Sequence, residues 1–391
     1  MEAGQAVKQA RETRREGKKS IRMKRTRQFT QDKSTPQRER LLTDQVNTHT
    51  MQRSSEIDIF RGLNILEMEN TESCDHPFFD HAEYEDMRLN YADTIFPCFA
   101  FISGMLLKPT RVVPVRKSVQ LIGLGMAFNA IPCVMEGTPF RPLGVLQRHG
   151  LSSIILNNVV PVEWRNSIKY PIALTTLWYL ISIVLATDKW RPFQEQKHTA
   201  QQKIDSPFFK GRTYHEHFDP EGLLGALMTA VSIWSGAWFS NNVAFTNWQT
   251  LLLGSGFFSA GYLISKILPN YFPMSKPLWS PAFVLATNGV TILKYLLLKV
   301  SMPYLPSVVS HVLAVVGRHS LEVYFLGEIT LLGLKYKPAV GGKSIWTRIE
   351  SFLSNHLPRG LTQTLLTVAF DAALVGFALL CNSKGWKIRL Y

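Results

Sequence analysis

Two side chains able to do acid, base or nucleophilic chemistry together stand in one stretch of the sequence, FFDHAEYEDMRLNYADTIFPCFAFISG, residues 78–104. They are His81, set among acids, and Asp93, at the start of the apolar run that follows. A neutral imidazole is both a nucleophile and a base near neutral pH, so His81 could accept an acyl group or a proton. Asp93 is the carboxylate expected to fix the imidazole tautomer and raise its basicity. Without such a partner, His81 is an ordinary histidine in a polar loop.

Further polar and ionisable residues stand inside or at the ends of apolar segments. In a bilayer such residues are costly, so their presence is a hint of function. We expect three of them to form intramembrane or structural pairs. The set comprises Asp58, Asn70 and the three expected to pair, Arg61, Arg148 and Glu328.

Two more groups of charged residues can each be explained either by a functional role or by a structural one. Asp219 and Glu221, in FDPEG, either bind the hydroxyls and amine of a substrate or begin a helix, because an early proline is typical of a helix start. The short basic segment KPTRVVPVRK either follows the rule that cytosolic loops are basic or binds the phosphates of a nucleotide-like cofactor. Its candidate phosphate-binding residues are Lys108, Arg111, Arg116 and Lys117.

The elements that must hold these residues are apolar blocks of membrane-spanning length. The chain has 391 residues, a mean hydropathy of +0.01, and 46% hydrophobic against 18% charged residues. About twenty residues cross the hydrocarbon core of a bilayer. On this rule we predict an all-α fold, a polytopic transmembrane helical bundle of about ten spans, near residues 56–70, 92–108, 117–136, 144–162, 168–187, 222–240, 248–268, 279–299, 308–334 and 361–381.

The first expected span, IDIFRGLNILEMEN, holds Asp58, Arg61, Glu67 and Glu69. Charges at bilayer depth are tolerated only when they are paired or face a wet cavity. We therefore expect this helix to be packed inside the bundle rather than to face lipid.

The amino-terminal region is basic and supplies much of the net charge of +14. We expect residues 1–52 to form a disordered cytosolic tail ahead of a transmembrane domain at 53–391. No zinc-ligand spacing or heptad register accompanies the basic residues, so we do not expect nucleic-acid binding. Alternation of the spans then puts the long loops 188–221 and 335–360, and also His81, on the non-cytosolic side.

Eight blocks of the sequence, in order between about residue 55 and 390, resemble the signature blocks of the heparan-alpha-glucosaminide N-acetyltransferase family. They are IDIFRGLNIL from Ile57, Asn70, FDHAEY from Phe79, ADTIFPCFAFISG from Ala92, RPLGVLQR from Arg141, FDPEGLLG from Phe218, KPLWSPAFV from Lys276 and GRHSLEVYFLGE from Gly317.

The resemblance implies a polytopic acyltransferase that moves acetyl from cytosolic acetyl-CoA to an amine across an organelle membrane. In the animal lysosomal members the acceptor is a terminal glucosamine of heparan sulfate. The active histidine of the family corresponds to His81, its aspartate to Asp93 and its asparagine to Asn70. In such a mechanism the Asn70 amide would hold the carbonyl oxygen as negative charge develops.

The resemblance also implies the surroundings of the enzyme. We expect membrane lipid and an amino sugar or other amine as partners, acetyl-CoA as the donor and no metal. A lysosome-like or vacuole-like endomembrane, and a possible homodimer, are carried over from the family.

Two other functions are open on the sequence. A transmembrane carrier of a small polar solute would also place polar residues at membrane depth. A catalytically silent relative would keep the scaffold and lose the chemistry, and the acidic residues Glu67, Glu69, Glu85 and Asp86 are where such a change would lie. Acetylation of an amine, uptake without acetylation, or neither would distinguish the three.

Overall fold

The fold is all-α in the part of the chain that the computed structural model describes, which confirms the all-α part of the predicted fold class. The described residues are 55–84, 86–107, 114–159, 167–215, 219–241, 245–336 and 342–388. The expected tail at 1–52 lies outside them, and so do Lys108, Glu85 and Arg111. Residues from Glu56 onward form a single unit.

A first helix, residues 55–73, carries the charged residues expected to force it into the interior, and its apolar side is indeed buried. Ile57, Ile59 and Phe60 are at most 2% exposed. Two of its charges pair with each other: Arg61 lies 3.8 Å from Asp58 and also donates a hydrogen bond to the Gly317 carbonyl. The helix is therefore packed among its neighbours, as its sequence predicts.

The centre of the bundle is a close crossing of α3 (Ile95–Met105) with α8 (Gly225–Asn241). A Cβ atom added to Gly104 would lie 1.8 Å from the Ile233 carbonyl oxygen, and one on Gly236 would lie 1.9 Å from that of Phe101. Only glycine fits at these two places, because the two backbones touch there. This crossing fixes the position of α3, and with it Asp93 immediately before α3.

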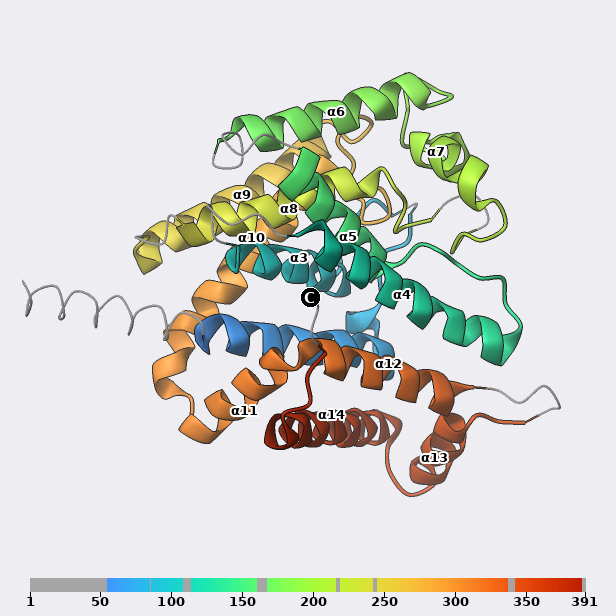
Figure 1. Cartoon of the computed structure of the whole chain (residues 1–391), viewed down its shortest axis with the longest axis vertical. Helices are drawn as coiled ribbons and strands as arrows, with labels where there is room; N and C mark the ends of the chain where they lie inside the picture. Colours follow the sequence, from blue (N-terminus) through green and yellow to red (C-terminus); the bar gives the residue numbers. More distant parts are fainter. Residues whose placement is uncertain are drawn as a thin grey trace, which may run out of the picture. The chain divides into compact units, whose positions relative to one another are not determined.

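Figure 1 shows helix 55–73 and α3 between two groups of helices, with α6, α8, α9 and α10 on one side and α11 to α14 on the other. In chain order the remaining helices are α4 (Val115–Glu136), α5 (Val145–Ile154) with a π-helical turn (Ile155–Val159), α6 (Lys169–Leu185), α7 (Ala200–Phe209), α9 (Asn247–Ile267), α10 (Pro281–Ser301), α11 (Ser307–Arg318), α12 (Ser320–Lys335), α13 (Ile345–Ser354) and α14 (Arg359–Lys384).

Local sequence signals begin the paired helices α9 and α10. Thr246 caps α9 in a capping box with Gln249, and Ser280 caps α10, with Pro281 in its first turn. These caps satisfy backbone N–H groups that a helix start leaves open. The loop between the two helices is consequently held at its Ser280 end, which matters for the site described below.

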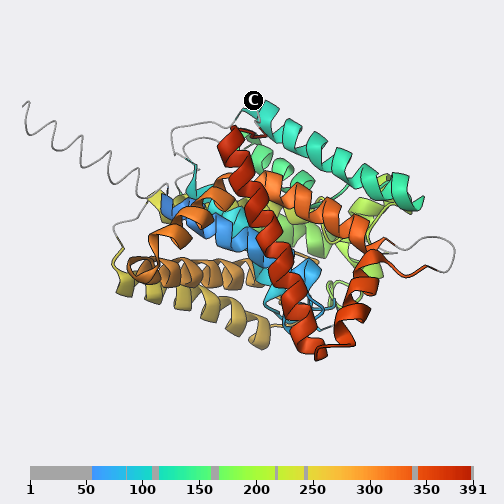
Figure 2. The same ribbon diagram turned by 90° about the horizontal axis from the view of Figure 1, so that it is seen from below.

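The predicted single span at 308–334 is wrong, because the chain breaks there into α11 and α12 at His319. The His319 N–H closes α11 on the carbonyls of Val315 and Val316. A Cβ on Gly317 would lie 1.7 Å from the Asp58 carbonyl oxygen, so helix 55–73 presses against α11 at this point. Figure 2 shows α14 running across the outside of this part of the bundle, where it contacts both α11 and α12.

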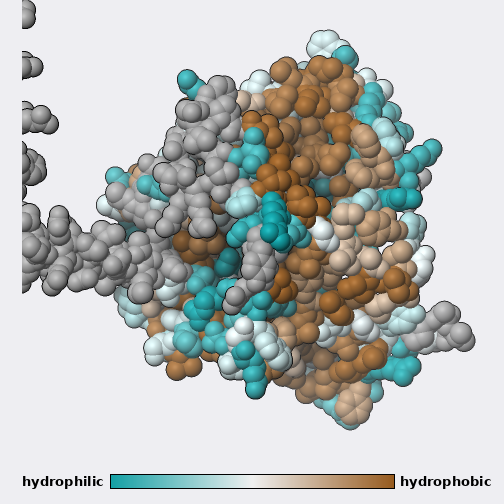
Figure 3. Space-filling model, in the orientation of Figure 1, coloured by the Kyte–Doolittle hydropathy of each residue, from teal (hydrophilic) through white to brown (hydrophobic). Residues whose placement is uncertain are grey.

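Four helical segments in the described residues are long and apolar enough to cross a membrane: Val115–Met135, Asn247–Ile267, Pro281–Tyr304 and Gly360–Lys384. Several of these helices present large apolar side chains outward, among them Leu252, Leu263, Leu365 and Val368. Figure 3 shows broad hydrophobic areas on the visible surface, and soluble proteins rarely expose large contiguous apolar patches. The chain is a multi-pass membrane protein.

The other blocks predicted as spans form shorter helices, among them Ala92–Met105, Lys169–Leu185 and Ser307–Arg318. The long loops predicted at 188–221 and 335–360 are not plain loops, because they contain α7 and α13.

Candidate active site

His81 and Asp93 are in contact. Nδ1 of His81 lies 2.9 Å from Oδ1 of Asp93, and the Asp93 side chain is completely buried while that of His81 is 47% exposed. A carboxylate accepts, so Nδ1 carries the proton and Nε2 keeps its lone pair. The pair therefore presents a basic, nucleophilic nitrogen at the surface of the bundle, with an anion fixed behind it.

The other carboxylate oxygen of Asp93 holds the loop that carries His81. Oδ2 accepts hydrogen bonds from the backbone N–H of Ala82 at 3.2 Å and of Asn90 at 3.1 Å. The Asn90 side chain in turn donates to the Asp80 carbonyl at 3.1 Å. The buried Asp93 carboxylate thus orients the imidazole and also fixes the backbone that follows His81 in the chain.

Aromatic residues fasten the same loop at two further points. Phe78 stacks on Tyr91 with ring centroids 4.5 Å apart, and His76 caps the short turn η1 (Pro77–Phe79). Tyr84 is 4% exposed and donates a hydrogen bond of 2.6 Å to the Phe193 carbonyl. The loop around His81 is therefore anchored on both sides of the imidazole.

Lys276 is the residue that sequence reasoning missed at this site. Its Nζ lies 3.0 Å from Nδ1 and 3.4 Å from Nε2 of His81, and 3.6 Å from Oδ1 of Asp93. The predicted alternation of spans puts the loop before α10 on the same side as His81, and that was the available signal. We call His81, Asp93 and Lys276 the open cluster.

The loop that carries Lys276 is held rigidly. The Ser280 hydroxyl accepts from the Ser275 N–H at 3.3 Å and donates to the Pro273 carbonyl at 2.5 Å. Trp279 is fully buried and has φ of 51°, a left-handed conformation that costs a non-glycine residue about 1–2 kcal/mol. Packing against Phe96, at 5.1 Å between ring centroids, helps to stabilise it there.

Burial lowers the pKa of Lys276 below that of an exposed lysine, although the negative charges of Asp93 and Glu221 act in the opposite direction. Removing an ammonium group from water disfavours its charged form. A larger fraction of Lys276 is therefore present as the free amine than of a lysine on the surface.

A second group of charges, Arg141, Asp219 and Glu221, forms what we call the closed cluster. Arg141 donates to both oxygens of Asp219, at 2.7 and 2.5 Å, and also to Glu221. Asp219 further accepts from the N–H of Tyr214 at 3.0 Å and of Glu221 at 2.9 Å. Asp219 is completely buried and its oxygens are fully bonded, so they are occupied within the fold. It does not begin a helix, as one reading of FDPEG expected, because α8 begins at Gly225.

Burial alone would raise the pKa of Asp219, but hydrogen bonding and attraction by Arg141 hold it below its ordinary value. Nearby Asp205 on α7 has no such cation at bonding distance among the residues that the structure describes. Burial raises the pKa of Asp205 to about 6, and its one hydrogen bond, from the Leu223 N–H, only partly offsets this.

Arg148, predicted to be a structural partner, connects the two clusters. Its guanidinium donates to the carbonyl of Pro220, beside Asp219, and lies 4.8 Å from the centroid of the Trp279 ring. Trp279 belongs to the loop of Lys276. Arg148 thus stands between the closed cluster and the loop that supports the open one.

The structure does not bring Asn70 into contact with His81. Its side chain hydrogen-bonds to Asp371 of α14. The neighbouring Glu69 turns toward α12, where its carboxylate lies against Gly327 and interacts electrostatically with Glu328. This side of helix 55–73 therefore faces α12 and α14.

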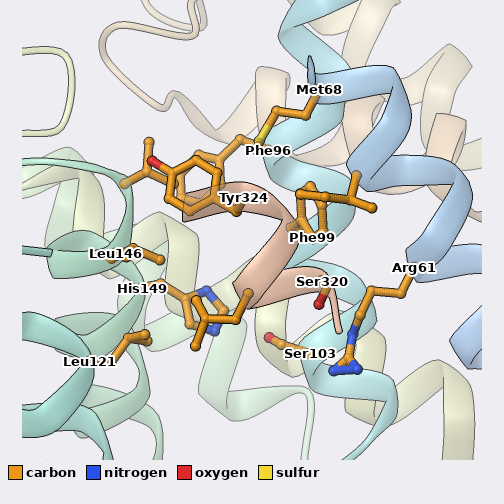
Figure 4. A pocket seen from close by; sticks show the side chains of 13 residues that line it. Arg61, Met68, Phe96, Phe99, Ser103, Leu121, Leu146, His149, Ser320 and Tyr324 are labelled. Carbon is orange, nitrogen blue, oxygen red and sulfur yellow. The ribbon is translucent and has the colours of Figure 1, made fainter. Parts of the chain in front are cut away.

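A cavity of about 220 Å³ lies between helix 55–73, α3, α4, α5 and α12. Figure 4 shows aromatic side chains at one end of it and polar ones at the other. Phe96, one turn after Asp93, belongs to the aromatic end, so the cavity runs along α3 away from the open cluster. The aromatic end has Phe96, Phe99 and Tyr324, and the polar end has Arg61, Ser103, His149 and Ser320.

Of the predicted cofactor-binding residues, the structure describes Arg116 and Lys117. They stand in the first turn of α4, reached after the chain has left α3 at the end opposite to Asp93; Arg116 is exposed and Lys117 is partly buried. No cluster of three or more metal-ligating side chains occurs in the described ranges.

No protein-family model matches this sequence, and no curated protein matches it either.

Proposed function

We propose that this multi-pass membrane protein is an acyltransferase that moves acetyl from acetyl-CoA to an amine, through His81. The hydrogen bond between the half-exposed His81 ring and the fully buried Asp93 carboxylate carries the proposal. An imidazole oriented in this way is the arrangement that activates an acyl acceptor or accepts the acyl group itself. The resemblance of eight sequence blocks to the heparan-alpha-glucosaminide N-acetyltransferases supports the same function.

In this reaction Nε2 of His81 removes a proton from the acceptor amine or attacks the thioester carbonyl. Asp93 keeps the proton on Nδ1 and stabilises the imidazolium that forms. In the first route the imidazolium then gives that proton to the departing thiolate. In the second route the thiolate takes a proton from solvent, and the acceptor amine later displaces Nε2 from the acyl group and gives it a proton. These roles need an accessible Nε2, and the exposure of the His81 ring supports that.

The cavity along α3 is the place we propose for the apolar arm of the donor. Its aromatic end begins one helical turn from Asp93, and its polar end lies toward the helix end from which the chain leads to Arg116 and Lys117. Cationic side chains there would attract the donor phosphates. Lys108 and Arg111, also predicted for that role, remain predictions.

The finer picture of the membrane topology also belongs to this proposal. About ten spans, shorter helices among them, would cross the bilayer with the amino terminus cytosolic and His81 on the other side. The acceptor would be an amino sugar or another amine, in a lysosome-like or vacuole-like compartment, and the protein could be a homodimer as in the family.

The test is acetyl transfer by the purified protein in lipid vesicles, with labelled acetyl-CoA and glucosamine. His81→Ala should lower the rate of transfer at least about 10³-fold, since both possible roles of the imidazole are lost. His76→Ala is a matched control, because His76 stands in the same loop and caps η1 without touching Asp93. Equal rates in the two variants would contradict the proposal.

A carrier of small polar solutes is the second candidate, and one observation favours it. Glu69 is completely buried, and no described residue donates a hydrogen bond to either of its carboxylate oxygens. Unpaired carboxylates at membrane depth are typical of proton and ion pathways. Labelled solute that enters the vesicles without being acetylated, and no longer enters after Glu69→Gln, would favour the carrier.

A further inference from the structure

Lys276 lies against both His81 and Asp93. Its Nζ is 3.0 Å from Nδ1 and 3.4 Å from Nε2 of His81, and 3.6 Å from Oδ1 of Asp93. A primary amine in its free form is a nucleophile toward an acyl group. Any acyl group that His81 receives or activates is therefore placed within reach of this amine.

From this geometry we infer that Lys276 is a site of self-acetylation, which the protein modifies with acetyl from its own thioester donor when no acceptor amine is present. The inference rests on the proposed function for the donor and for the role of His81. Beyond the proposed function, it assigns to Lys276 the role of an acetyl acceptor within the protein. Lys276 would take this role at the place where an external amine has to approach the imidazole.

The step balances from the free amine. The Nζ lone pair attacks the carbonyl carbon of the thioester, an N–C bond forms and the C–S bond breaks. One proton leaves Nζ for Nε2 of His81 and passes to the departing thiolate, so the products are an N-acetyl lysine and the free thiol. If the acetyl group has first moved to His81, the bond to Nε2 breaks instead and Nε2 receives the proton.

The surroundings of Lys276 favour this reaction. Burial lowers the pKa of Lys276, so a larger fraction of it is present as the free amine than of an exposed lysine. The Lys276 side chain is 19% exposed, so it is shielded from bulk water yet reachable, and its loop is fixed by Ser275, Ser280 and Trp279. Acetylation would remove the positive charge beside Asp93 and fill the space next to the imidazole.

The protein provides a matched lysine for comparison. Lys294 on α10 has the same side-chain exposure, 19%, but it is paired with Glu67 and lies 5.1 Å from the centroid of the Tyr91 ring. A reaction that depends only on burial or on free acetyl-CoA would modify both lysines. A reaction that depends on His81 would modify Lys276 alone.

The experiment incubates the full-length protein in lipid vesicles with labelled acetyl-CoA and no acceptor, then treats it with hydroxylamine. Hydroxylamine releases acetyl from imidazole and leaves a lysine amide intact. We expect hydroxylamine-resistant label on the peptide that contains Lys276. The label should be absent from Lys276→Arg, should form about 10²-fold more slowly in His81→Ala, and should not form when glucosamine is in excess. Lys294 should stay unlabelled.

Each other outcome overturns the inference. Label that hydroxylamine removes from His81, with Lys276 unmodified, overturns self-acetylation and leaves the proposed acyltransferase standing. Equal label on Lys276 and Lys294, or label on Lys276 that persists in His81→Ala, means unassisted chemical acetylation. If neither the protein nor glucosamine is acetylated, the proposed function falls together with the inference.

Discussion

The open and closed clusters are built on the same plan and end in opposite states. Each has an aspartate with no exposed side-chain surface, Asp93 or Asp219, that accepts two backbone N–H groups and faces a cation. In the closed cluster the fork of Arg141 takes both oxygens of Asp219. In the open cluster the Asp93 carboxylate is shared between Lys276 and an imidazole that is 47% exposed.

The difference teaches that a concentration of buried charge does not mark a reactive site. All the acceptors of Asp219 are occupied, so the closed cluster stabilises the fold. Asp93 uses only Nδ1 of His81, while Nε2 lies 3.4 Å from the Lys276 Nζ and the ring is half-exposed. What distinguishes the open cluster is an imidazole that solvent can reach, whereas Asp219 has no exposed side-chain surface.

The largest effect should come from Asp93→Asn. An asparagine can keep its carbonyl toward the backbone N–H groups of Ala82 and Asn90, but its amide N–H₂ then faces Nδ1 of His81 and forces the proton onto Nε2. Loss of the Nε2 lone pair should slow acetyl transfer by about 10³-fold. The measurement is the transfer rate, with thermal unfolding as a check that the fold persists. A rate within threefold of the wild type would break the comparison between the clusters.

The next effect concerns stability. Arg141→Met leaves the buried carboxylate of Asp219 without its cation, and removal of one partner of a buried pair should destabilise the protein by about 3 kcal/mol. Arg88→Ala is the control, because Arg88 pairs with Asp86 at 3.1 Å with both side chains exposed. That surface pair should contribute less than about 1 kcal/mol. Unfolding midpoints in detergent measure both, and similar shifts would show that the closed cluster is not structural.

The smallest of the three effects is a gain. Asp205 has its pKa raised to about 6 by burial, above the ordinary value of 3.8, so its charged form destabilises the fold and stability falls as the pH rises from about 4 to about 6. Asp205→Asn should therefore stabilise the protein at pH 7 by about 2 kcal/mol, and not at pH 4. The exposed Asp75 provides the control, because Asp75→Asn should show no such dependence in thermal unfolding at the two pH values. A gain from Asp205→Asn that is equal at both pH values would contradict this account.

The contact between His81 and Asp93 could be anticipated because both belong to one loop and the helix start that follows it. An acid just ahead of an apolar helix has few places to go except toward that loop. The contact with Lys276 could not be anticipated in the same way, because 195 residues separate Lys276 from His81. Such a pairing depends on how α3 packs against α8 and α10, and no local pattern records that.

The contact of Asn70 and the break within the block 308–334 could not be predicted for a related reason. The direction in which Asn70 points depends on the rotation of helix 55–73 about its axis, and the contact with α14 sets that rotation. The block 308–334 has the apolar content of one span, but the crossing at Gly317 and the polar pair Arg318 and His319 divide it into two helices. Apolar content predicts where helices occur and much less well where they stop.

Trp279 has a consequence for genetics. The Arg148 guanidinium, which also donates to a carbonyl beside the closed cluster, lies over the Trp279 ring. The Trp279 N–H donates to the Lys276 carbonyl and so closes the turn that begins at Lys276. Substitutions in the two clusters should therefore show epistasis, because a shift of Arg148 would reach the amine through the indole. A loss of turnover in an Arg141 variant would then be an indirect effect of the displaced indole, without any direct role for Arg141 in the chemistry.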